Sequence, residues 1–125
     1  MHLLLVGIGG LCGTLARYLL DTWITDATHA TFPWGTLVIN LSGSFAIGVL
    51  FVLTVERGTL PAELRAPLGI GFLGGYTTFS TFMLESLRLA EGGAWPLALA
   101  NIAGSMILGL GAVIAGVALA RAIAA

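Results

Sequence analysis

The clearest deficit in this sequence is charge. Charged residues make up 9% of the 125 residues and hydrophobic residues 58%, whereas ordinary soluble domains carry about 25% charged residues. A soluble protein with so few charges would have little with which to cover its surface. Lysine is missing altogether, because all five basic residues are arginines, and the formal net charge is −1. The composition predicts an integral membrane protein and argues against a nucleic-acid partner.

Cysteine and catalytic groups are also scarce. Cys12 is the single cysteine, so no disulfide can form within the chain, and we interpret it as a buried, inert thiol. The start of the chain lacks the basic region and the small-residue cleavage site of a signal peptide. We therefore expect it to be retained as a membrane helix. His2 and His29 fall outside the apolar stretches, and no nucleophile, base and orienting group can be assembled, which argues against an enzyme.

Long apolar stretches account for most of the chain. Each has roughly the 20 residues that a helix needs to cross a bilayer, and the connecting segments are short. The sequence therefore predicts an all-α integral membrane protein that forms a single transmembrane domain over residues 1–125. The expected helices cover about residues 3–20, 34–55, 68–87 and 96–120.

Small residues recur four positions apart in these stretches. Such spacing lets membrane helices approach closely, because packing rather than the hydrophobic effect drives their association. Close packing of four thin helices leaves little interior volume for a pore within one copy, so we expect oligomerisation. The pairs are Gly9 and Gly13, Ser44 and Gly48, Gly71 and Gly75, and Ser105 and Gly109.

The third stretch contains the segment GGYTTFSTF at residues 74–82. The pair Gly74–Gly75 weakens a helix and predicts that it is broken at this point. Loosened backbone and hydroxyls are tolerated in hydrocarbon only where protein or a water-filled cavity surrounds them. At helical spacing Thr77, Ser80 and Thr81 would share one face. The segment is therefore interpreted as the wall of a permeation path.

Four other side chains of the membrane stretches are candidates for that path. Asn40, with Ser44 one turn later, either cross-links helices or aims a donor at a passing anion. Phe79 and Phe82 either fill space or turn the electropositive edges of their rings toward a small anion. A polar residue such as Asn40 within a membrane helix is a functional hypothesis by default.

Two charged residues sit near the ends of the stretches. Glu85 is expected at the end of the third segment, near the interface. Arg17 either snorkels to the interface or turns inward to bond the backbone exposed by the Gly74–Gly75 break. A proton-coupled transporter would need a carboxylate near the middle of a membrane helix, and we find none at such a position in the sequence.

The arginines give almost no bias in orientation. Four helices would place both termini and the loop at residues 56–67 on one side of the membrane. The count is then three arginines against two. The protein is either weakly oriented by charge, or inserted both ways up and paired antiparallel, and the charges leave both open. One side carries Arg57, Arg65 and Arg121, and the other Arg17 and Arg88.

With these residues in hand, the chain resembles the Fluc (CrcB-type) fluoride channel family over almost its whole length. Three ordered motifs carry the resemblance: GGLCGTLARY at residues 9–18, PWGTLVINLSGSF at residues 33–45, and GFLGGYTTFSTF at residues 71–82, followed by Glu85. The fourth stretch matches less distinctly. Asn101 and Ser105 are polar there, and the resemblance assigns them no role.

The resemblance implies an antiparallel, dual-topology homodimer in a prokaryotic plasma or inner membrane. It would conduct fluoride passively out of the cytoplasm through two pores and protect against fluoride toxicity. Asn40 would be the pore amide and Phe79 and Phe82 the rings that flank the ions, with hydroxyls along the path. These hydroxyls are Ser44, Ser80 and Thr81.

The same resemblance implies a central sodium ion on the dimer axis, held by the backbone carbonyls of Gly74 and Thr77. Arg17 would be a structural residue near the break, and Glu85 would face a vestibule. Tyr76 stands where phenylalanine is common in the family. We expect that difference to affect packing more than the choice of ion.

Two rival functions fit the size and the short loops. A four-helix multidrug/proton antiporter relies on a carboxylate in its first helix, and here none precedes Asp21. A non-conducting membrane assembly protein would use its polar faces only to join helices. Fluoride efflux, proton-coupled cation transport, or neither would separate the three.

Overall fold

The computed structural model describes residues 1–124, and every regular element in that range is helical. Three continuous helical segments are long and apolar enough to cross a membrane. These results confirm the all-α prediction. The three segments are α1 (His2–Thr28), α2 (Trp34–Phe51) with the π-helical turn η1 (Val52–Glu56), and α5 (Trp95–Ile123).

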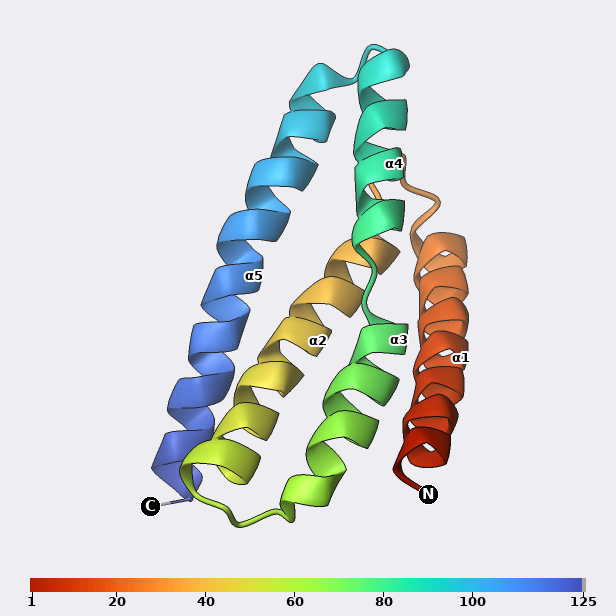
Figure 1. Ribbon diagram of the computed structural model, residues 1–125. Helices are drawn as coiled ribbons and strands as arrows, with labels where there is room; N and C mark the ends of the chain where they lie inside the picture. Colours follow the sequence, from red (N-terminus) through yellow and green to blue (C-terminus); the bar gives the residue numbers. More distant parts are fainter. Residues whose placement is uncertain (125) are drawn as a thin grey trace.

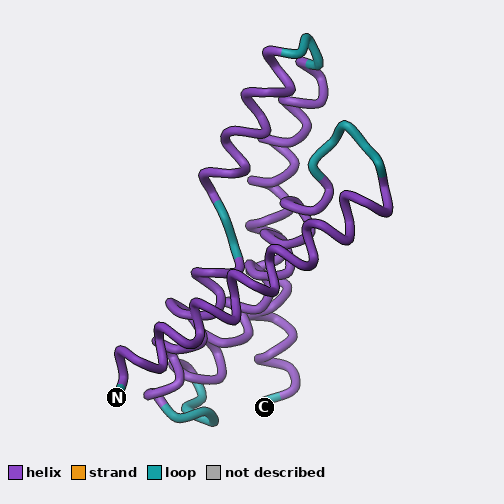
Figure 2. The backbone as a smooth tube through the Cα atoms, turned by 90° about the vertical axis from the view of Figure 1, so that its right-hand side faces the viewer, coloured by secondary structure: helices purple, strands orange, loops and turns teal. Residues whose placement is uncertain are grey.

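The third predicted stretch is two helical halves joined by extended backbone. After the short turn η2 (Ala62–Leu64), the first half consists of the π-helical η3 (Ala66–Leu73) and α3 (Gly74–Tyr76). The second half is α4 (Phe79–Glu91). Between them Thr77 and Thr78 are extended, with ψ angles of 159° and 124°. Figure 2 shows this interruption, called the break below, as a loop partway along the bundle.

The helices form one elongated bundle (Figure 1), with both chain ends at the same end of it. Helix α1 packs against the first half of the broken segment, η3 and α3. Helix α2 packs mainly against α5, and α5 also contacts α4. The break joins α3, which packs with α1, to α4, which packs with α5, and α2 contacts both α3 and α4.

Helix α1 is longer than the expected residues 3–20. It continues to Thr28 and ends at His29, which adopts a left-handed conformation (φ 47°) and donates its N–H to the carbonyl of Thr25 at 2.9 Å. The additional residues are too polar to belong to an apolar stretch. They are held by tertiary contacts, because Gly35 of α2 packs directly on Asp21 and Ile24 is buried. The other expected helices differ from the observed segments by at most four residues at either end.

The predicted position of the break was wrong. Gly74 and Gly75 are helical, and the interruption lies at Thr77–Thr78. Gly75 serves close packing instead, because a Cβ atom on it would lie 2.6 Å from the carbonyl oxygen of Gly10 in α1. A helix made of small residues stays helical when a neighbouring helix packs tightly on it.

The paired small residues do mediate helix contacts, as predicted. A Cβ on Gly71 would lie 2.6 Å from the carbonyl oxygen of Val6, and one on Gly48 would lie 2.5 Å from that of Val113. Gly116, which the sequence pattern missed, fits against the backbone of Phe45 in the same way, whereas Gly109 makes no such contact. The expectation for Cys12 was also wrong, since this thiol is exposed on α1.

Gly13→Ala should lower the stability of the folded protein by about 1–3 kcal/mol, the usual cost of overpacking a close contact. A Cβ there would overlap the backbone carbonyl of Phe72. Helical backbone cannot move aside as the end of a flexible side chain can. Gly7→Ala is the matched control on the same helix, because nothing lies within 4 Å of its Cβ position. Thermal unfolding in detergent compares the two, and equal midpoints would contradict the packing argument.

Candidate functional site

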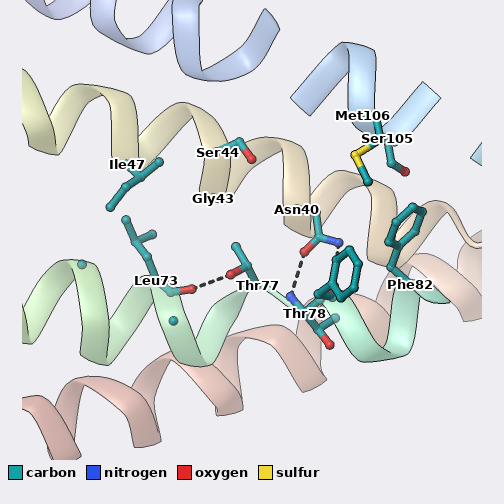
Figure 3. Close-up of a pocket in the computed structure, with 13 residues that line it drawn as sticks. Asn40, Gly43, Ser44, Ile47, Leu73, Thr77, Thr78, Phe82, Ser105 and Met106 are labelled. Atoms are coloured by element: carbon teal, nitrogen blue, oxygen red, sulfur yellow. Dashed lines mark hydrogen bonds between the residues drawn. The ribbon is translucent and has the colours of Figure 1, made fainter. Parts of the chain in front are cut away.

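The break opens onto a cavity of about 360 Å³, called the break groove below. Helices α2, α4 and α5 and the first half of the broken segment all contribute to its wall, as Figure 3 shows. Every lining side chain is neutral. Four of the predicted pore residues line the groove, namely Asn40, Ser44, Phe79 and Phe82, and so do both predicted sodium ligands, Gly74 and Thr77.

Asn40 holds the break in place. Its Nδ2 donates to the carbonyl of Thr78 at 2.9 Å, and its Oδ1 accepts the N–H of the same residue at 2.8 Å. One side chain thus replaces two backbone bonds that an unbroken helix would have made. The structure confirms the cross-linking interpretation. A carboxamide has two N–H groups, so the second is left over for the groove.

The hydroxyls after the break do not share one face, contrary to the prediction. Thr77 bonds back to the carbonyl of Leu73 at 2.9 Å. Thr78 caps α4 by accepting the N–H of Thr81 at 3.3 Å, and the two hydroxyls are 3.1 Å apart. Ser80 and Thr81 are exposed and lie outside the break groove. The prediction assumed continuous helical spacing, which the extended residues interrupt.

The two phenylalanines differ in their surroundings. Their rings meet edge to face, with centroids 5.9 Å apart and planes at 62°. Phe82 is only 3% exposed, so it is part of the protomer core, whereas Phe79 is 65% exposed. Phe82 therefore packs within the protomer and also lines the groove, and the exposed ring of Phe79 leaves its faces and edges available to whatever occupies the groove.

Arg17 turns inward, as one of its two interpretations proposed. Its Nη1 donates to the carbonyl of Thr77 at 3.5 Å, and the side chain is half-buried. The snorkelling interpretation was wrong. A second cavity of about 260 Å³ lies beside it, on the α1 side of the break, and Thr81 lines this cavity. Arg17 thus places a positive charge against the carbonyl end of α3.

Glu85 occupies the middle of α4 rather than the end of the segment, because α4 continues to Glu91. Its Oε1 accepts the hydroxyl of Thr36 at 2.8 Å, while its Oε2 is buried without a partner within residues 1–124. Glu85 lines a third cavity of about 360 Å³, near the start of α2. Sequence reasoning missed Thr36, although it lies one helical turn before Asn40 and on the same side of α2.

The carbonyls at the end of α3 are the candidate cation ligands. The last four carbonyls of a helix have no partner within it. The described residues 1–124 contain no cluster of three His, Cys, Asp or Glu side chains suited to a metal. Carbonyl oxygens suit hard cations. The carbonyl of Thr77 accepts a hydrogen bond from Nη1 of Arg17 at 3.5 Å.

Tyr76 makes packing contacts, and its smaller effect on the choice of ion stays a prediction. Its ring stacks on Phe72, with centroids 5.9 Å apart, and its hydroxyl is 2.8 Å from that of Ser42 on α2. Gly43 completes this contact, because a Cβ there would overlap the side chain of Thr77. Helix α2 can therefore lie directly against the break.

The chain matches a known family over most of its length. The model of the CrcB-like proteins (Camphor Resistance, CrcB) matches residues 4–117. A fluoride-specific ion channel FluC from Solibacter usitatus is 51% identical over 122 residues, which cover 97% of this chain and 99% of the relative. The FluC protein of Hahella chejuensis is 48% identical over 122 residues, covering 98% and 96%. That of Rhizobium meliloti is 46% identical over 121 residues, covering 97% of each.

Proposed function

The chain belongs to the CrcB-like protein family, and on that premise we propose that it is a passive, fluoride-selective ion channel. Family membership and the apolar helices make it a multi-pass protein of a prokaryotic inner membrane. The observation that carries the proposal is the break groove, which is neutral and has an amide and a ring at its wall. The relatives named above are fluoride-specific channels.

The chemistry of the groove suits fluoride. This anion is small and strongly hydrated, so a selective path must offer donors in place of water. Conduction also requires that the ion can leave again. A charged side chain in the groove wall would hold the anion tightly, whereas the remaining N–H of Asn40, hydroxyls and the edge of Phe79 attract it more weakly. Fluoride would leave the cytoplasm along the membrane potential, which would protect the cell from its accumulation.

Ion-selective efflux from liposomes tests this function. Purified protein should release fluoride rapidly and chloride far more slowly, without a proton gradient. Release of an organic cation driven by protons would favour the multidrug antiporter instead. No flux of any of these solutes in a folded protein would favour a membrane assembly protein.

We extend the proposal to an antiparallel homodimer with four membrane crossings per copy, the broken segment being one, and two pores. The support is the open wall of the break groove, where Phe79 is exposed in the single protomer, together with the family resemblance. A second copy related by a twofold axis would cover this wall. The arginine count supports antiparallel insertion less than the sequence suggested. Arg17 bonds to the break and does not count toward either side of the membrane. One side then carries three arginines and the other only Arg88.

Antiparallel insertion predicts that a cysteine label applied from outside intact cells reaches about half of the molecules. In a Cys12→Ala background, Glu63→Cys and Glu91→Cys place single thiols at exposed positions at opposite ends of the bundle. Each should be half labelled before lysis and fully labelled after it. Complete labelling of one site and none of the other would contradict dual topology.

We also propose a structural sodium ion on the dimer axis, held by the carbonyls of Gly74 and Thr77 from both copies. Freed carbonyls in a membrane must find partners, and both residues line the break groove. Arg17 already donates to Thr77, so the guanidinium and the ion would share this carbonyl end.

Removal of sodium during purification should therefore weaken the dimer or slow fluoride flux, and lithium or potassium should restore either imperfectly. Sedimentation in detergent measures the dimer, and liposome efflux in sodium-free buffers measures the flux. Choline-based buffer of equal ionic strength controls for screening. Unchanged assembly and flux without sodium would remove the ion from the proposal.

A further inference from the structure

A short chain of polar side chains joins α4 to α5 beside the break groove. Asn101 lies in the apolar helix α5 and is 1% exposed. Its Nδ2 donates to the hydroxyl of Ser86 at 2.9 Å, and that hydroxyl donates to the carbonyl of Phe82 at 2.8 Å. Ser105 is the last member, with its hydroxyl 3.5 Å from Oδ1 of Asn101. The side chains of Ser86, Asn101 and Ser105 have no assigned role in the sequence motifs or in the proposed pore.

The direction of every proton in the chain is determined. The carbonyl of Phe82 can only accept, so the hydroxyl of Ser86 must donate to it. Ser86 then accepts from Asn101, which orients the amide with its oxygen toward Ser105. The hydroxyl of Ser105 is therefore the donor in the last bond. Because each of these side chains has a hydrogen-bond partner, the orientation of the amide is fixed.

The last bond is the long one, and it ends at the groove. Ser105 and Phe82 both line the break groove and appear near one another in Figure 3. At 3.5 Å the contact with Asn101 is longer than an ordinary O–H···O hydrogen bond, so little is lost when the hydroxyl turns away from it. A serine without such an acceptor commonly bonds the carbonyl four residues earlier in its own helix. That bond would withdraw the donor from the groove.

We propose that Asn101 is a positioning residue, which keeps the hydroxyl of Ser105 available as a donor to the anion in the break groove. The hydroxyl of Ser105 donates a weak hydrogen bond to the amide oxygen of Asn101, which keeps it on the groove side of α5. When an anion arrives, the hydroxyl turns from the amide oxygen and donates to the anion instead. Ser86 keeps the amide in the required orientation and ties it to the backbone of Phe82. This inference rests on the proposed channel function.

The test is a double-mutant cycle on fluoride efflux. Asn101→Leu keeps the volume and removes the acceptor, and Ser105→Ala removes the hydroxyl. Each should slow the efflux rate per channel by about tenfold, the scale of one hydrogen bond to a charged group. The double variant should be no slower than either single variant, because both act through one donor.

The liposomes are prepared with so little protein that each contains one channel or none, which separates an effect on permeation from an effect on folding. The fraction of liposomes that empty counts working channels, and the rate of emptying reports permeation through each one. Thr54→Val is the control, since it removes another buried hydroxyl, which bonds to the carbonyl of Leu50 at 2.7 Å and does not line the groove. It should lower the fraction of emptied liposomes at most, and leave the rate unchanged.

An unchanged rate in Asn101→Leu would overturn the inference, and so would effects of the two substitutions that simply multiply. If Asn101→Leu fails to fold, Ser86→Ala tests the same claim more gently, since it frees the amide without removing it. Its rate should fall between those of the wild type and Ser105→Ala, and a rate equal to the wild type would also refute the role. Absence of fluoride flux in the wild type would instead refute the proposed function.

Discussion

Asn40→Asp is expected to abolish fluoride flux while leaving a folded protein. One carboxylate oxygen can still accept the N–H of Thr78, as Oδ1 of Asn40 does at 2.8 Å. The other oxygen takes the place of Nδ2 and can no longer donate to the carbonyl of Thr78 or to an anion. The substitution therefore keeps half of the link to the break and turns the donor in the groove into a negative charge.

The expected size of this effect follows from Coulomb's law. Two like charges 4 Å apart repel by about 4 kcal/mol at an effective dielectric constant of 20, which slows permeation about a thousandfold. The lost hydrogen bond costs about 1–3 kcal/mol of stability, which a folded membrane protein can tolerate. Flux should therefore fall far more than stability does.

Liposome efflux and thermal unfolding of the same preparation provide the measurement. Asn40→Ala is the matched control, because it removes the amide without adding charge, and it should retain measurable flux. If Asn40→Asp conducts fluoride at a rate close to that of the wild type while folded, Asn40 does not belong to the permeation path.

Phe79→Ile should slow fluoride flux by at least tenfold and leave stability nearly unchanged. The ring is 65% exposed, so its loss removes little packing within the protomer. Isoleucine keeps an apolar side chain of moderate size but has no electropositive ring edge. The effect should therefore appear in transport alone.

Phe82→Ile should affect both properties, because this ring is 3% exposed and meets Phe79 edge to face. We expect a loss of about 1–3 kcal/mol in stability and slower flux. Phe51→Ile is the control, since that ring is half exposed and lies away from the break groove. Stability loss without any change in flux for Phe79 and Phe82 would assign both rings to packing.

Hydropathy, the residues that mark helix ends and the spacing of glycines together predicted most of the architecture. The starts of the second and fourth helices were predicted within one residue of Trp34 and Trp95, because proline and tryptophan mark these ends in the sequence. The close approach of α1 to the broken segment was also predictable, since Gly9 and Gly71 have no side chain to keep backbones apart. These features depend on residue type and local spacing, which a sequence displays directly.

The sequence predicted most of the residues that line the break groove, but not how they are arranged. Asn40, Ser44, Phe79 and Phe82 do meet in one groove. Ser80 and Thr81 do not, because the assignment of a shared face assumed helical backbone where Thr77 and Thr78 are extended. An error of a few residues in the position of a break rotates every side chain beyond it.

By itself the sequence determined that this protein is helical, apolar and closely packed, and that a break interrupts its third membrane stretch. Only the tertiary structure decided where the break lies, since a side chain from another helix, Asn40, bonds both backbone groups of Thr78. It also decided that α1 extends to Thr28 and that Asn101 faces Ser86. The reason is common to all three: each is fixed by a contact between residues distant in the chain, and neither propensity nor hydropathy encodes such contacts.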